Sequence, residues 1–556
     1  MSKVRELIRQ GRRDELWQMC CGFLDLSLEQ FMVIQKRLML EQIGLLKNCE
    51  LGRKIMHGAI PETVDEFRQQ VPLTTYGDYC PELLEQREDV LPGKTGRWVR
   101  TSGRSGEYSA KWVPMSEDFC RELSILGGAL AVLALCKYRG DVSRVKEHLK
   151  LLMTMGPPEY GSRAVGDAAK EAINFDFLPS NADDMPFEDR IKAGLQEALY
   201  RGIDGFAGLP FILVAAGEQF KQQSSKVNIR LILSHPSALL RILRGMIKSK
   251  LSRRSLLPKD LWTIKGIIGS GTDTVIFKQR IEQLWGRYPL EAYAGTEGGV
   301  YAIQTWDYEG MVFAPTLNFF EFIPENEHFK WQIDHSYQPK TILLNEVKAG
   351  NLYELVITNF HGGSLVRYRL GDMIRITDLR NEKLGIDIPQ MVFERRADDL
   401  IDIGFMRLTE KIIWQAIENT GIPYTDWVAY KEIIGERSVL HLHLELKDNY
   451  IASERGLATA IYEQVKKLDD GFIHGDLSSL EKNIDFKPIE VTLLPEGAFA
   501  NYITKRRAEG ADLAHLKPPH INPSDKILAL LGTKIEAIPS VEVVAETKTE
   551  AIASRK

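Results

Sequence analysis

Cysteine is scarce in this sequence. All six cysteines lie between Cys20 and Cys136, and none occurs in the rest of the 556-residue chain. There is no Cys-x-x-Cys pair and no later cysteine and histidine cluster, so the ligand spacing of a zinc site is absent. We therefore interpret the cysteines as reduced, ordinary thiols.

Long apolar runs and an excess of one charge are also missing. No stretch reaches the roughly 20 apolar residues of a membrane span, and charged residues interrupt the first 24 positions, where a signal peptide has its apolar core. The 76 acidic and 71 basic side chains nearly cancel, giving a net charge of −5. The lack of both apolar segments predicts a cytoplasmic protein. The charge balance predicts a small-molecule partner rather than nucleic acid or a membrane.

The sequence predicts more than one domain, because the chain is too long for a single ordinary one. Apolar residues recur at three- and four-residue intervals from Val4 to Met56, which predicts amphipathic helices. Strand-like runs, among them 229–233, 263–268 and 366–368, alternate with helical segments further on, which favours an α/β fold. We expect a large N-terminal domain over 1–397, its first 70 residues helical, a small α+β C-terminal domain over 398–535, and a frayed tail over 536–556.

A Ser/Gly-rich loop from Thr101 to Gly106 is the first candidate for chemistry. It lies between two short apolar segments, Trp98-Val99 and Lys111-Trp112-Val113, so we expect a loop held by two strands. Its glycines let backbone amides approach an anion, and Lys111 supplies positive charge. The lysine spacing is not that of a Walker loop. Taken alone, a Ser/Gly loop of this kind is more often a plain turn.

Three further segments add polar groups after strand-like runs. Tyr293-Ala-Gly-Thr-Glu297 offers a carboxylate for Mg²⁺ and a ring that can stack on a purine. The alternative is that this segment forms an ordinary surface turn. Asp372, in the segment Tyr-Arg-Leu-Gly-Asp, comes just after a predicted strand, a position from which Asp often binds the hydroxyls of a ribose. The alternative is that Asp372 belongs to a β-turn. Arg396 lies beside the predicted domain boundary at Asp398, and its guanidinium suits recognition of a phosphate or a ribose. The alternative is that Arg396 belongs to a run of solvated charged residues.

These segments follow one another as TSGRSGEYSAKWVP, YAGTEGG, YRLGD and FERRADD. In this order they resemble the core motifs of the adenylate-forming superfamily of acyl-CoA synthetases, peptide-synthetase adenylation domains and luciferases. The flanking text is similar to the Gretchen Hagen three family, the auxin-responsive acyl acid amido synthetases. The segments that carry this similarity are VPLTTYGDY from Val71, NFFEFIP from Asn318 and GAFANYITKRRAEGADLAHLKPP from Gly497.

The resemblance implies an adenylate-forming fold that binds ATP and Mg²⁺, with a mobile C-terminal domain hinged at Asp398. It implies that Lys517 reaches the reacting carboxylate and α-phosphate. It assigns Ser102, Gly103, Arg104, Ser105, Gly106 and Lys111 to the phosphates, and Thr296 and Glu297 to the phosphate and Mg²⁺ contacts, with Glu297 as the metal ligand. It places Ser270 and Tyr293 at the adenine, Gly295 in the nucleotide site, and Asp372 and Arg396 at the ribose.

Two positions depart from the family pattern. Arg104 stands where threonine or serine is usual, and Pro519-His520 stands where plant-like members have Pro-Arg. The sequence leaves open whether Arg104 adds a phosphate contact or occludes the triphosphate. Elsewhere His441 and His443 share one face of a predicted strand, which we interpret as a polar sheet face rather than a metal site.

The expected reaction activates a carboxylic acid as acyl-AMP and transfers the acyl group to an amine, by resemblance that of an amino acid. A carboxylate:CoA ligase, with a thiol acceptor, shares the first half-reaction. A non-catalytic nucleotide or acyl-ligand binding protein is a third hypothesis, motivated by the two departures. The particular acid and the oligomeric state do not follow from the sequence.

Overall fold

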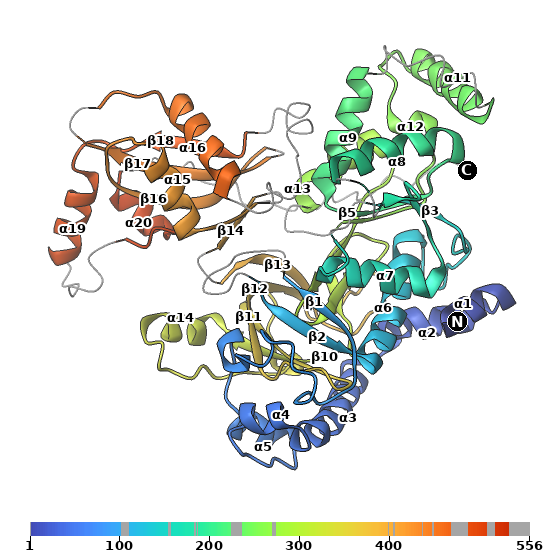
Figure 1. Cartoon of the computed structure of the whole chain (residues 1–556), viewed down its shortest axis with the longest axis horizontal. Helices are drawn as coiled ribbons and strands as arrows, with labels where there is room; N and C mark the ends of the chain where they lie inside the picture. The colour runs from blue at the N-terminus through green and yellow to red at the C-terminus, as the bar shows by residue number, and fades with distance from the viewer. Residues whose placement is uncertain are drawn as a thin grey trace, which may run out of the picture.

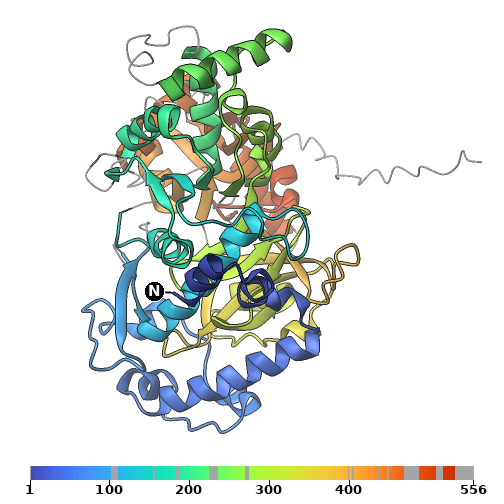
Figure 2. The same ribbon diagram turned by 90° about the vertical axis from the view of Figure 1, so that its right-hand side faces the viewer.

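The computed structural model describes residues 2–101, 110–153, 157–182, 185, 187–223, 236–269, 274–397, 400–403, 406–435, 437–447, 450–468, 487–508 and 518–532 (Figures 1 and 2). An 11-stranded sheet runs through the large part of the molecule in the order β10-β11-β12-β13-β9-β8-β7-β6-β5-β3-β4. Its strands are β3 (Lys150–Met153), β4 (Asp176–Leu178), β5 (Gly205–Gly208), β6 (Gly266–Gly269), β7 (Leu290–Gly295), β8 (Gly299–Gln304), β9 (Met311–Phe313), β10 (Asn318–Pro324), β11 (Leu352–Asn359), β12 (Tyr368–Asp378) and β13 (Gln390–Arg396).

The sheet has two halves of different topology. From β10 to β7 neighbouring strands are antiparallel, and from β7 to β4 they are parallel. Parallel neighbours need crossover connections, and the intervening helices supply them. The predicted α/β class is confirmed, and β7 is the strand at which the two halves meet.

Helices of the parallel half enclose a core of their own. They are α8 (Phe187–Arg201), α9 (Pro210–Gln223), α11 (Pro236–Leu251), α12 (Pro258–Leu261) and α13 (Thr274–Trp285). Trp262 and Trp285 stack here with ring centroids 6.1 Å apart. Each buried indole N–H donates to a backbone carbonyl, of Ala198 and Leu213 respectively, so burying these rings leaves no polar group unsatisfied.

N-terminal helices pack against the antiparallel half, and one of them, α6, also packs against β6 of the parallel half. These are α1 (Lys3–Gln10), α2 (Arg13–Cys21), α3 (Leu28–Lys47), α4 (Glu50–Ile55), α5 (Val64–Gln70), α6 (Glu117–Leu135) and α7 (Gly161–Ile173). The periodicity from Val4 to Met56 therefore predicted helices correctly. Buried Gln35 of α3 donates to the backbone carbonyls of Pro315 and Asn318 at 2.6 and 2.8 Å, which fixes this helix against β10.

A smaller α+β part follows Arg396 and lies beside the large sheet in Figure 1. It has its own core and consists of the strand pair β14 (Leu400–Ile403) and β15 (Met406–Thr409), the three-stranded sheet β16 (Tyr424–Ile434), β17 (Arg437–Leu446) and β18 (Ile489–Leu493), and the helices α15 (Glu410–Asn419), α16 (Glu454–Leu468), α19 (Ala498–Ala508) and α20 (Asp525–Leu530). Asp398 lies outside the described residues, so the domain boundary there remains a prediction.

Several expectations for individual strands need correction. Strand β16 was not expected, because Lys431 and Glu432 interrupt its apolar alternation. The strand expected from Thr263 begins only at Gly266. The strand expected from Val366 begins at Tyr368, because Arg367 has a φ of +45°, outside the extended region. The strand expected over 229–233 lies outside the described residues. Among those described, no helix is both long and apolar enough to cross a membrane.

Candidate functional site

The centre of the candidate site is the carboxylate of Asp372. In the register of β12 and β13, Asp372 lies opposite Arg396, and Arg396 Nη1 donates to its Oδ1 at 2.6 Å. The Tyr293 hydroxyl, at the end of β7, donates to Oδ2 at 2.6 Å. Three residues that the sequence singled out separately are thus brought together.

The position of Asp372 corrects one detail of the sequence interpretation. It was expected just after a strand or in a β-turn, but it lies inside β12, which continues to Asp378. The preceding Gly371 has a φ of +70° and its carbonyl accepts from the Ala397 amide at 2.7 Å. A side chain would be strained in this conformation. The backbone deviation at Gly371 therefore places a polar residue within a continuous strand.

Burial and electrostatics fix the state of Tyr293. Its ring packs against Tyr301 and Phe393, with centroids 4.8 and 6.1 Å away. Burial, and next the negative charge of Asp372, raise the pKa of its phenol well above the ordinary value. Tyr293 therefore stays protonated and donates to Asp372. Its predicted contact with adenine remains a prediction.

The turn after β7 is held by two buried amides that the sequence interpretation missed. Asn318 Nδ2 donates to the Gly298 carbonyl at 2.8 Å, and Asn359 Nδ2 donates to the Glu297 carbonyl at 3.0 Å. Asn359 also donates to Asn318 Oδ1 at 2.9 Å. This network fixes the turn backbone from β10 and β11, so Thr296 and Glu297 are held in place while their side chains remain partly exposed. Asn318 is the first residue of the segment NFFEFIP, so the similarity of that segment was the only sequence feature that pointed to this amide.

Thr296 lies against the first residue of α7. A Cβ on Gly161 would approach the Thr296 Cα to 2.7 Å, so only glycine allows this contact. The first turn of a helix carries partial positive charge and unpaired amides. The turn after β7 therefore faces an environment that favours an anion.

The base of the Ser/Gly-rich loop reaches the same helix end from the other side. Strands β1 (Thr95–Arg100) and β2 (Trp112–Ser116) flank the loop as expected, and the Thr101 amide donates to the Lys111 carbonyl at 3.0 Å. The Arg100 amide donates to the Glu159 carbonyl at 2.7 Å. Its guanidinium lies over the Tyr160 ring, 4.9 Å from the centroid. The loop base and Thr296 thus converge on residues 159–161.

Lys111 and Glu297 are placed near aromatic rings. The ammonium of Lys111 lies 5.8 Å from the centre of the Tyr76 ring. Burial raises the pKa of the Tyr301 and Tyr368 phenols most, and the negative charge of Glu297 is the second cause that raises it. No group of three or more ligand side chains placed for a metal occurs among the described residues. One carboxylate fits Mg²⁺, which is commonly held by one or two carboxylates together with substrate phosphates.

Several predicted site residues lie outside the described ranges. They are Ser102, Gly103, Arg104, Ser105, Gly106, Ser270, Asp398 and Lys517. The departure at His520 is described: its ring stacks on Trp427, and its two nitrogens lie 2.5 Å from Glu410 and 2.8 Å from Asp426. His441 and His443 stack with centroids 4.4 Å apart, and His441 Nε2 lies 2.7 Å from the Thr492 hydroxyl.

Comparison with known families places these elements in one class. The GH3 family N-terminal domain matches residues 21–186, which contain β1, β2 and the start of α7. The GH3 family central domain matches residues 311–396, which contain Asp372 and Arg396. The resemblance to acyl acid amido synthetases of this family is therefore confirmed. Models of the GH3 family thus match two regions of the chain, which together make up less than half of it.

Curated relatives match part of the chain. Jasmonoyl–L-amino acid synthetase GH3.5 of Oryza sativa subsp. japonica is 26% identical over 279 residues, 47% of this chain and 46% of that protein. The 4-substituted benzoates-glutamate ligase GH3.12 of Arabidopsis thaliana is 26% identical over 246 residues, 40% of this chain and 39% of that protein. The matches span less than half the length of these relatives. The solved AtGH3.15 acyl acid amido synthetase in complex with 2,4-DB aligns with 92% of this chain and 95% of its own, at 17% identity and a TM-score of 0.49.

Proposed function

We propose that this chain is a cytoplasmic, ATP-dependent ligase that activates a carboxylic acid as acyl-AMP and transfers the acyl group to the amine of an amino acid. The observation that carries the proposal is the Asp372 carboxylate of β12, held between Tyr293 and Arg396. Tyr293 lies on β7, and the fixed turn with Thr296 and Glu297 follows that strand. The relatives named as amino acid synthetases and ligases support the same acceptor class.

Asp372 and Arg396 suit the ribose of ATP. The ion pair with Arg396 and the Tyr293 hydroxyl hold the carboxylate in one orientation. A fixed carboxylate is a strong acceptor for the hydroxyls of a ribose. In this proposal the pair selects a nucleoside and sets where its phosphates lie.

The phosphates would lie between the loop of Ser102 to Gly106 and the turn with Thr296. Backbone amides of the glycine-rich loop, the ammonium of Lys111 and the end of α7 all favour negative charge there. Glu297 would hold Mg²⁺, which when bound neutralises charge on the triphosphate.

The reaction follows from this arrangement. An oxygen of the substrate carboxylate attacks the α-phosphorus, the bond to the β-phosphate oxygen breaks, and pyrophosphate leaves. Lys517 would stabilise the charge that develops on the α-phosphate and carboxylate oxygens. After rotation about Asp398, the amine of the second substrate attacks the acyl carbon and AMP leaves with the electrons of the broken C–O bond. The amine nitrogen releases one proton to solvent, which leaves a neutral amide.

The test is release of pyrophosphate from ATP by the full chain, with a panel of carboxylic acids. Acid-dependent release supports adenylation, and its absence with every acid would favour a binding protein instead. The active acid is then incubated with mixed amino acids and CoA, and products are identified by mass spectrometry. An amide product supports the proposal, whereas a CoA thioester as the sole product would make the chain a carboxylate:CoA ligase.

A further inference from the structure

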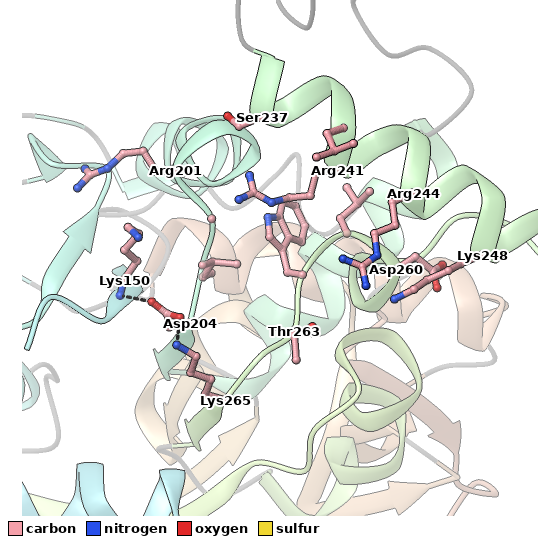
Figure 3. Close-up of a pocket in the computed structure, with 15 residues that line it drawn as sticks. Lys150, Arg201, Asp204, Ser237, Arg241, Arg244, Lys248, Asp260, Thr263 and Lys265 are labelled. Carbon is pink, nitrogen blue, oxygen red and sulfur yellow. Dashed lines mark hydrogen bonds and ion pairs between the residues drawn. The ribbon is translucent and has the colours of Figure 1, made fainter. Parts of the chain in front are cut away.

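A basic cavity of about 650 Å³ lies between α8, α11 and α12, among helices that the proposed function does not use (Figure 3). Six basic and two acidic residues line it. The basic residues are Lys150, Arg201, Arg241, Arg244, Lys248 and Lys265, and the acidic ones are Asp204 and Asp260.

Carboxylates offset only part of this positive charge: besides the contacts of Asp204 and Asp260, Arg201 pairs with Glu197 and Asp176 outside the cavity lining. Asp204 pairs with Lys265 at 2.6 Å. Asp260 pairs through both oxygens with Arg254, which does not line the cavity, at 2.7 and 2.8 Å. Arg244 and Lys248, both exposed on α11, therefore add their charges to a cavity whose carboxylates are already paired. The cavity suits an anion.

Helix α11 also presents an apolar stripe to solvent. Leu240, Leu243, Ile247 and Leu251 recur at helical spacing and are 70%, 49%, 61% and 81% exposed. The opposite face, with Ile242 and Gly245, packs on the protein, where a Cβ on Gly245 would lie 3.1 Å from Leu256. Since one face already anchors the helix, the exposed stripe is not needed to hold α11 in place.

The stripe and the cavity adjoin along the same helix. Leu240 belongs to both, and Arg244 and Lys248 are each one turn from a stripe residue. Helix α11 lies at the outer end of the parallel half in both views (Figures 1 and 2). Apolar and basic groups are thus available on one outward surface.

We propose that α11 and the adjoining basic cavity form a docking site for a membrane surface rich in anionic phospholipid. The stripe enters the headgroup and acyl boundary, and lipid phosphates bind Arg244, Lys248 and the cavity. An apolar stripe flanked by Lys and Arg is the pattern of helices that lie in a membrane interface, and each basic residue near an anionic leaflet adds attraction. The total charge of −5 pointed away from such a partner because it averages over the whole chain.

The test is co-sedimentation of the full chain with vesicles of phosphatidylcholine alone or mixed with phosphatidylserine. We expect at least about tenfold tighter binding to the anionic vesicles, weakening with added salt. Two double variants remove the two features separately: Ile247→Ser with Leu251→Ser, and Arg244→Glu with Lys248→Glu. Each should lose at least about tenfold in affinity for the anionic vesicles.

The control carries the same kinds of change on α3, Val33→Ser with Lys36→Glu. Val33 is exposed to the same extent as Ile247, 61%, and this variant should bind like the parent. Circular dichroism and thermal melting establish that all variants are folded. Equal binding to both vesicle types, or folded α11 variants that bind like the parent, would overturn the proposal.

Two other results would also overturn the proposal, because they would show that the cavity or the apolar stripe binds a different partner. Thermal stabilisation by inorganic phosphate without vesicle binding would make the cavity a site for a soluble anion. A dimer in solution that Ile247→Ser with Leu251→Ser dissociates, again without vesicle binding, would make the stripe a contact between two copies of the chain.

Discussion

Gly161 and Thr296 lie so close that a Cβ on the glycine would come within 2.7 Å of the threonine Cα. They belong to α7 and to the turn after β7, which are separated by more than a hundred residues of chain. This contact joins the base of the Ser/Gly-rich loop, through residues 159 and 160, to the turn that carries Glu297.

Gly161→Ala should displace the turn and impair adenylation. The added methyl would meet backbone, which cannot rotate away, so we expect a cost of about 1–3 kcal/mol in the free energy of unfolding. Acid-dependent pyrophosphate release should fall by about tenfold or more, because small displacements of reacting groups are costly. Gly44→Ala on α3 is the control, since a Cβ there meets nothing within 4 Å. Equal activity of the two variants would contradict a role for this contact.

Asp372→Asn should weaken ATP more than it slows the chemical step. The variant loses the charge that pairs with Arg396 and accepts from Tyr293. Hydrogen bonds to charged groups contribute roughly 1.5–3 kcal/mol, so we expect the KM for ATP to rise about 10–100-fold. Asp378→Asn, at the exposed end of β12, should leave KM unchanged. A parental KM for ATP in the folded Asp372 variant would reject the ribose assignment.

Glu297→Gln should raise the concentration of Mg²⁺ that half-maximal pyrophosphate release requires. The amide keeps the shape of the side chain but lacks the negative charge that a hard cation prefers. The measurement is a Mg²⁺ titration at saturating ATP and acid. The matched control is Glu309→Gln, on an exposed residue. Identical Mg²⁺ dependence in all three proteins would show that Glu297 does not hold the metal.

His520 should make folding stability depend on pH. The hydrogen bond to Asp426 is the largest cause that raises its pKa above 6.5, and Glu410 adds to it. The folded state therefore favours the protonated ring, so its contribution is fully present below pH 6.5 and is lost as pH rises through the folded pKa. Thermal melting of the full chain should show this loss.

Two variants of His520 separate charge from packing. His520→Gln should remove this part of the pH dependence and destabilise the protein most at low pH. His520→Arg keeps a charge at every relevant pH, so melting should lose the dependence but not the stability seen at pH 6. A parental melting profile in both variants would mean that the contacts of His520 with Asp426 and Glu410 contribute nothing to stability.

The sequence predicted the elements of the candidate site better than their arrangement. The four motifs located β7, β12 and β13 and singled out Tyr293, Asp372 and Arg396. Whether Asp372 and Arg396 lie opposite each other depends on the register of β12 and β13. The hydrogen bond from Tyr293 to Asp372 joins residues 79 positions apart in the sequence. Local patterns carry no information on either. The bracing amides Asn318 and Asn359 were missed for the same reason.

Burial was the other quantity that the sequence could not supply. Helix α11 has apolar residues on two opposite faces, and periodicity alone does not say that Ile242 is buried while Ile247 is exposed. Strand β16 was missed because charged residues interrupt its alternation, although pairing with β17 stabilises it. Tertiary neighbours decided both outcomes.

The mixed sheet has a consequence for expressing parts of this protein. Residues 21–186 contain β3 and β4, and residues 311–396 contain β9 to β13, but β5 to β8, which join these groups in the sheet, lie in neither region. A fragment cut at either boundary would expose the unpaired edge of β3 or β9, a template for aggregation. We therefore expect neither matched region to fold on its own.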